Sequence, residues 1–155
     1  MSPLDASSAP DIEERRRWMG TLAKAPPDRL DELWQTLAEK PDYRCLKGPE
    51  IGLAMVRGRT GGTGVPFNMG EMSVTRCIVQ TVDGQLGYAC VAGRSERHAE
   101  LAAVFDALLQ NGDRRAALKE TVIAPLDREW RSRRAKRGAK AASTKVEFFT
   151  MVRGD

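Results

Sequence analysis

The chain has 155 residues, of which 41% are hydrophobic and 30% charged, and its formal net charge is +4. This length predicts one domain, and the composition is typical of a globular protein rather than a collagen-like or fully disordered one. No stretch approaches the roughly 18 consecutive apolar residues of a membrane span, and the N-terminus lacks the apolar core of a secretory signal. We therefore expect a protein of the cytoplasm that does not contact a membrane.

The N-terminal part predicts an arm followed by two helices. Residues 1–11 are rich in Pro, Ser and Ala and predict a disordered arm, so that residues 12–155 form a single α+β domain. From Ile12 onward, apolar residues recur at helical spacing until Pro26 and Pro27. A second helix is expected from about Pro27, because proline suits a first helical turn.

The middle of the chain predicts antiparallel strands. Residues 43–94 contain ten of the fourteen glycines and most of the β-branched runs. Alternation of side chains and turn residues indicates strands, with a hairpin turn at Asp83 and Gly84. The expected strands are residues 43–47, 51–57, 72–82 and 85–92.

The C-terminal part returns to helical patterns. Ser95 is a plausible N-cap for a helix over residues 96–110, and residues 113–122 predict a further short helix. We expect a break at residues 123–126, then a helix-compatible basic segment up to Gly138, and a last strand over residues 146–152. The pattern predicts an α+β fold with an antiparallel sheet of about four to five strands, flanked by helices from the N-terminal and C-terminal parts.

A glycine-rich segment is the densest chemical feature. It contains Arg57, Arg59, Gly61, Gly62, Thr63 and Gly64. Backbone N–H groups and guanidinium groups in such a segment can bind phosphate or phosphonate oxygens. No Gly-Lys-Ser/Thr follows, and no helix is expected directly after it, so it is neither a P-loop nor a dinucleotide fingerprint. A tight connection between strands and a protein-interface loop are the alternatives.

Other candidates are scattered along the chain. His98, the only histidine, and Glu100 lie near the start of a predicted helix, where His98 would act as a general base or make a capping or interface hydrogen bond. We treat the following as candidates for an interface or the rim of a site: Arg76, Arg94, His98, Glu100, Phe148, Phe149 and Arg153. One histidine and three scattered cysteines predict no metal site.

The positive charge is concentrated in residues 128–145. Eight basic residues and one acidic residue give this segment a net charge of +7, whereas the rest of the chain carries −3. Such a segment can hold a polyanion or an acidic partner surface. It contains one aromatic residue, Trp130, while surfaces that bind single-stranded nucleic acid usually interleave several, so we regard nucleic acid as the less favoured partner.

Several motifs occur together in a recognisable order. They are RTGGTG at residues 59–64, SVTRC at 73–77, GQLGYACVAGR at 84–94, HAE at 98–100, IAPL at 123–126 and FFTMVRGD at 148–155. This series closely resembles the PhnG family, whose members are subunits of the bacterial carbon–phosphorus lyase system for phosphonate breakdown. The resemblance covers roughly residues 12–155.

The resemblance implies a place in a core complex with PhnH, PhnI and PhnJ. In that system an alkylphosphonate displaces adenine from ATP to give a ribose 1-alkylphosphonate 5-triphosphate. PhnI supplies the nucleosidase activity, PhnG and PhnH are required, and PhnL is also needed. PhnJ later breaks the carbon–phosphorus bond with an iron–sulfur cluster and S-adenosylmethionine. The resemblance carries over no catalytic residue.

Three hypotheses follow from the sequence. The first is an accessory subunit of a hetero-oligomer that binds no cofactor alone, with ATP as substrate of the complex. The second is an enzyme in its own right that acts on a phosphate-bearing ligand through the glycine-rich segment and His98. The third is a nucleic-acid-binding protein that uses the basic segment 128–145.

Overall fold

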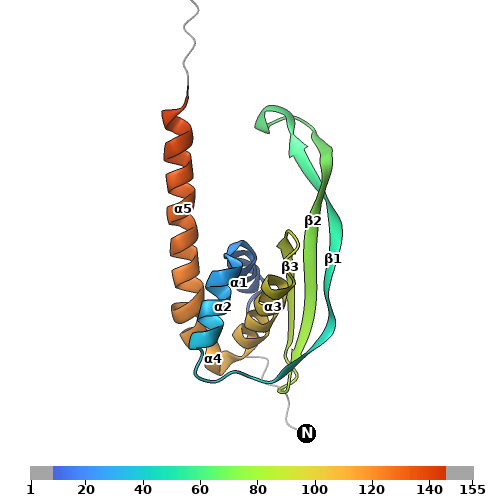
Figure 1. The fold of residues 1–155 in the computed structure, drawn as a ribbon, viewed down its shortest axis with the longest axis vertical. Coiled ribbons are helices and arrows are strands. Elements are labelled where there is room, and N and C mark those ends of the chain that lie inside the picture. The colour runs from blue at the N-terminus through green and yellow to red at the C-terminus, as the bar shows by residue number, and fades with distance from the viewer. Residues whose placement is uncertain (1–8, 146–155) are drawn as a thin grey trace, which may run out of the picture.

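A computed structural model describes residues 9–145 (Figure 1). The expected arm over residues 1–11 and the expected strand over residues 146–152 therefore fall largely or wholly outside the described residues. The elements in chain order are α1 (Ile12–Lys24), α2 (Pro27–Thr36), β1 (Tyr43–Arg59), a short 3-10 turn η1 (Thr60–Gly62), β2 (Pro66–Thr81), β3 (Leu86–Ala92), α3 (Glu96–Gln110), α4 (Gly112–Leu118), a π-helical turn η2 (Lys119–Ile123) and α5 (Ala124–Ser143).

Within residues 9–145 the sheet has three antiparallel strands in the order β1-β2-β3. The α+β class is confirmed, but the expectation of four to five strands is wrong, because residues 43–47 and 51–57 belong to the one strand β1. Gly48 and Pro49 interrupt the sequence pattern, yet the ladder with β2 only shifts register between Lys47 and Glu50 and then continues. Proline is tolerated at such an irregularity in an edge strand.

Helix α3 covers one face of the sheet and forms the centre of the core. Its side chains at Ala99 and from Leu101 to Leu109 are buried together with Val79 of β2 and Val91 of β3. Strand β3 and helix α3 approach each other closely at Gly87, because this residue has no side chain. A Cβ atom there would collide with the carbonyl oxygen of Ala103 in α3. Helices α1 and α2 complete this layer, so the described helices lie on one side of the sheet (Figure 1).

A buried carboxylate ties α1, α3 and the sheet together. Asp106 of α3 is fully buried and accepts hydrogen bonds from Arg15 Nη2 at 2.8 Å, Trp18 Nε1 at 2.9 Å and the backbone N–H of Tyr88 at 3.0 Å. Because these donors come from α1 and β3, the single side chain fixes both against α3. A buried charge needs such partners to offset its loss of solvent.

The predicted break at residues 123–126 is wrong. The chain stays helical from α4 through η2 into α5, and Pro125 lies in the first turn of α5. An extra residue in a π-helical turn and a proline near a helix start both change the local hydrogen bonding without ending the helix. Helix α5 also continues past Gly138 to Ser143.

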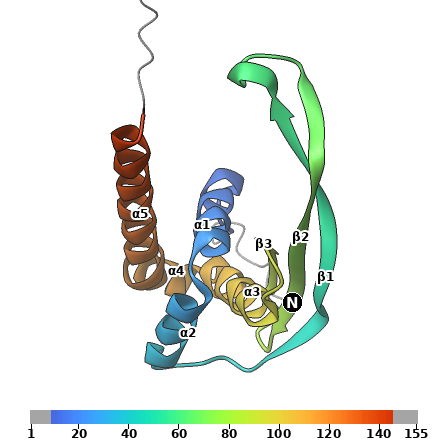
Figure 2. The same cartoon turned by 45° about the horizontal axis from the view of Figure 1, so that its top comes forward.

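Two elements project from the body. Strand β3 pairs only with residues 74–80 of β2, so the rest of the β1–β2 hairpin is a two-stranded ribbon. We define the ribbon as residues 51–72, a range that includes its base, where Ile51 and Gly52 pair with Thr75 and Val74 of the three-stranded part. Figures 1 and 2 show that the ribbon and the second half of α5 both extend beyond the packed helices, with the η1 turn at the far end of the ribbon.

Candidate interaction surface

The ribbon exposes apolar side chains on the face that it shares with the core. Ile51 pairs with Thr75 and Leu53 pairs with Ser73, so alternation places Ile51, Leu53 and Met55 on the side of the sheet that α3 covers closer to the body. No helix within residues 9–145 covers this face further out, and the three side chains are 44–60% exposed. We call this side the inner face of the ribbon.

The opposite side, the outer face, is also apolar. Phe67 pairs with Gly58, and the Met69 side chain lies over Gly58, where a Cβ atom would collide with the sulfur. Met72 pairs with Ala54 on the same face. These three large side chains are 39–64% exposed. The ribbon is therefore apolar on both faces, which is unusual for a surface that meets only water.

The glycine-rich segment forms the tip of the ribbon. Arg57 and Arg59 lie at the end of β1, and Gly61 and Gly62 both adopt positive φ within η1. Arg59 Nη1 donates to the carbonyl oxygen of Gly64 at 3.1 Å. The backbone N–H of Gly64 in turn donates to the carbonyl oxygen of Thr60 at 2.9 Å. The tip, with Thr63 within it, is mostly exposed and lies far from the start of α3 in both views (Figures 1 and 2).

His98 lies in the core. Its side chain is buried, its backbone N–H donates to Ser95 Oγ at 3.3 Å, and Nε2 lies 2.9 Å from the carbonyl oxygen of Leu22. Because a carbonyl oxygen only accepts, Nε2 carries the proton and donates. The structure thus brings His98 to the α1–α3 interface and does not bring it to the glycine-rich segment.

Glu100 takes part in a polar cluster beside the body. It accepts a hydrogen bond from Tyr43 Oη at 2.7 Å, and Arg97 donates to Asp31 at 2.9 Å and links α3 to α2. Burial, reinforced by the Glu100 carboxylate, raises the pKa of Tyr43 to about 12. Burial also raises the pKa of the Cys77 thiol to about 12, with the Cys45 thiol as a further cause.

The remaining candidates lie apart from one another. Arg76 is exposed on the outer side of the sheet, paired with Glu50 and Cys90, and Arg94 is exposed after β3. Phe148, Phe149 and Arg153 lie outside the described residues. The structure does not gather the described candidates into one site.

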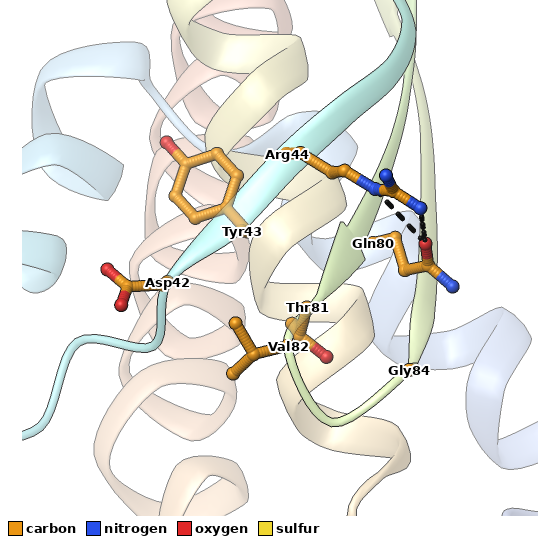
Figure 3. A pocket seen from close by; sticks show the side chains of 7 residues that line it. All are labelled: Asp42, Tyr43, Arg44, Gln80, Thr81, Val82 and Gly84. Atoms are coloured by element: carbon orange, nitrogen blue, oxygen red, sulfur yellow. Dashed lines mark hydrogen bonds between the residues drawn. The ribbon is translucent and has the colours of Figure 1, made fainter.

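A pocket of about 390 Å³ lies at the opposite end of the sheet from the ribbon tip (Figure 3). It is formed where β1 begins and β2 turns into β3, and Figure 3 shows Arg44 held against Gln80, to which it donates at 2.8 Å. None of the candidate residues chosen from the sequence lines it. Its sequence carries no motif, since its lining side chains come from two distant segments.

The basic segment forms most of α5. The side chains from residue 134 onward are exposed, whereas Leu126 is buried against the body. Trp130, its one aromatic residue, has Lys24 Nζ at 4.6 Å and the Arg134 guanidinium at 5.2 Å from its ring centroid. Cations already lie against this ring, which disfavours stacking of a nucleic-acid base on it.

The exposed apolar residues of the ribbon are the feature that the sequence pattern did not reveal. Their alternation was visible, but alternation does not show where the covering helices end. Within residues 9–145, no helix has the length and apolar character needed to cross a membrane.

Two comparisons with known proteins add to this geometry. A family model described as "Phosphonate metabolism protein PhnG" matches residues 13–154. The chain belongs to the PhnG family. Within it, the chain is 42% identical to a protein of Rhizobium meliloti (strain 1021), over 98% of this chain and 99% of that one. That PhnG protein is named alpha-D-ribose 1-methylphosphonate 5-triphosphate synthase subunit PhnG.

Membership in the PhnG family confirms the resemblance drawn from the sequence motifs. The match includes the ribbon, its glycine-rich tip and the basic helix α5. A PhnG relative named as a subunit works with other chains, and an exposed ribbon with two apolar faces is the kind of feature that such a chain needs.

Proposed function

We propose that this chain is an accessory subunit of the complex that makes ribose 1-alkylphosphonate 5-triphosphate from ATP and an alkylphosphonate, with release of adenine. Its partners are PhnI-, PhnH- and PhnJ-type subunits, with a PhnL-type accessory protein, in a hetero-oligomer of the cytoplasm. The bond-making chemistry belongs to the partners. ATP is a substrate of the complex, and this chain alone binds no cofactor.

The projecting ribbon is the observation that supports this proposal most strongly. An isolated two-stranded hairpin is at best marginally stable in water, and the ribbon adds exposed apolar side chains on both faces. Burial of such side chains contributes about 25 cal/mol per Å² of apolar surface removed from water. Association with another chain supplies that burial.

The arrangement of polar side chains also supports an accessory role. The Nε2 atom of His98 is engaged with a backbone carbonyl in the core, and the glycine-rich tip lies far from it (Figure 1). A general base must reach the proton that it removes, directly or through one water. Neither feature provides a nucleophile beside an accessible base.

Co-expression tests the proposal. The affinity-tagged chain should recover co-expressed PhnI-, PhnH- and PhnJ-type subunits in fixed proportion. The recovered assembly should release adenine from ATP and methylphosphonate. The control is the same tag on an unrelated protein of similar charge. Recovery of this chain alone, with the partners active without it, would remove the proposal.

A further inference from the structure

We propose that the ribbon enters a two-walled apolar groove of another subunit, as a tongue enclosed on both faces, rather than lying flat on a surface. The inference rests on the proposed function and adds the mode of binding. It assigns the groove apolar walls and an acidic inner end, and it names the contact residues on this chain.

The two faces of the ribbon argue for enclosure. Leu53 on the inner face is 60% exposed and Met69 on the outer face is 64% exposed, and each has further apolar neighbours on its own side. A flat partner surface covers one face of a two-stranded ribbon and leaves the other in water. Covering both requires a partner wall on each side.

The charges of the ribbon argue for the depth of insertion. Residues 51–72 include three charged side chains, those of Arg57, Arg59 and Glu71. The two arginines flank the tip, which would enter the groove first. A buried charge is tolerated when it is paired, so the inner end of the groove must supply carboxylates or carbonyl oxygens to these guanidinium groups, beyond the bond that Arg59 makes to Gly64. Glu71 pairs with Met55 on the inner face, so the wall that covers this face must supply one hydrogen-bond donor to its carboxylate.

A second copy of this chain fits these requirements less well. Pairing of two copies edge to edge through β1 covers neither face, and stacking of two ribbons face to face covers one. A pocket of about 730 Å³ between α1 and α5 is lined largely by charged side chains, among them Glu14, Lys24 and Lys119. The ribbon of a second copy would therefore meet charged rather than apolar side chains if it entered this pocket.

Methionine oxidation reports on both faces without any substitution. Met55 lies on the inner face and Met69 on the outer face, so dilute peroxide should oxidise both in the free chain, as read by mass spectrometry. In the assembly with co-expressed PhnI-, PhnH- and PhnJ-type subunits, both should be protected by about tenfold or more. Half-buried Met19 of α1 is the internal reference. Protection of one face alone would show a flat contact and overturn the proposal.

Paired substitutions give an independent readout. Leu53→Asp and Met69→Asp should each lower recovery of the partner subunits by about tenfold or more, because each would place an unpaired carboxylate in the groove. The control is Val82→Asp, since Val82 is 73% exposed at the other end of the sheet. If an Asp variant misfolds, Leu53→Thr and Met69→Thr replace it, because threonine favours a strand. Each Thr variant should also lower recovery of the partner subunits, by less than the Asp variant at the same position.

The outcomes separate the two proposals. Partner recovery by the unmodified chain with normal recovery by both face variants would overturn the tongue and leave the proposed function standing. The free chain could instead form dimers that both substitutions dissociate while recovery of the partner subunits stays normal. That result would show that the ribbon binds a second copy of this chain, and it would also overturn the tongue. Failure of the unmodified chain to recover any partner would remove both proposals.

Discussion

The imidazole of His98 illustrates how one residue can suggest catalysis in a sequence and serve packing in a structure. Its position three residues after Ser95 was predictable, and the Ser95 cap is confirmed. Its partner, the carbonyl oxygen of Leu22, is 76 positions away and comes from α1. Sequence reasoning had no means of pairing these two atoms, because only tertiary packing brings α1 onto α3.

Replacement of His98 tests this structural role. His98→Ala should lower the free energy of unfolding by about 1–3 kcal/mol, since it removes a buried side chain together with its hydrogen bond. The Leu22 carbonyl oxygen then keeps only the 3.3 Å hydrogen bond from the backbone N–H of Ala25. His98→Gln, which keeps a donor, should recover part of that loss. The assembled complex should turn over ATP and methylphosphonate at an unchanged rate per complex. Unchanged stability together with lost turnover would instead assign His98 to catalysis.

Tyr43 gives the stability of the chain a predicted dependence on alkaline pH. Its pKa is raised from 10.0 to about 12, so the unfolded chain ionises first as the pH rises. The stabilising contribution is fully present below pH 10 and is lost as the pH rises towards 12. Cys77, whose pKa is raised from 9.0 to about 12, acts in the same direction.

Urea unfolding at neutral pH and within this alkaline window measures the effect. The midpoint should fall with rising pH, and Tyr43→Phe should make that fall shallower while lowering the midpoint at neutral pH through loss of the bond to Glu100. Tyr88→Phe, on the outer side of the sheet, is the matched control. An equally steep fall in the Tyr43→Phe variant would contradict the assignment.

At the scale of elements, the contact of α3 with β3 depends on the absence of a side chain at Gly87. A Cβ atom there would overlap the Ala103 carbonyl oxygen, which belongs to the rigid backbone of a buried helix. Gly87→Ala should therefore lower the free energy of unfolding by about 1–3 kcal/mol. Chemical unfolding followed by circular dichroism measures this directly.

The control for Gly87 is Gly20→Ala in α1. A Cβ atom at Gly20 meets nothing within 4 Å, and alanine is a better helix former than glycine by about 1 kcal/mol. Gly20→Ala should therefore leave stability unchanged or raise it. If the Gly87→Ala variant were as stable as the Gly20→Ala variant, α3 and β3 would not pack as closely at Gly87 as the structure shows.

The elements show which sequence signals are reliable. The helix over residues 96–110 and the turn at Asp83 and Gly84 were predicted, because both depend on local patterns. The expected breaks at Pro49 and Pro125 were wrong. A proline weakens a local pattern, but an edge strand with shifted register and a helix with a π-helical turn both accommodate it.

At the scale of the whole molecule, the ribbon could not be recognised from the sequence. Side chains in residues 51–57 alternate in polarity as they do in any half-buried strand. This pattern does not show whether a helix covers the apolar side. In the structure α3 covers the sheet near the body, and among the described elements no helix reaches over the ribbon (Figures 1 and 2). Family membership, by contrast, was predictable from the order of short motifs along the chain.

We propose that the complex needs this chain for the reaction and that the other subunits carry out the chemistry. The decisive experiment measures adenine release from ATP and methylphosphonate with the partner subunits alone, with this chain alone and with both. We expect release only when both are present, with His98→Ala as active as the unmodified chain once assembled. Full release by this chain alone, or by the partners without it, would show that the proposed division of roles is wrong.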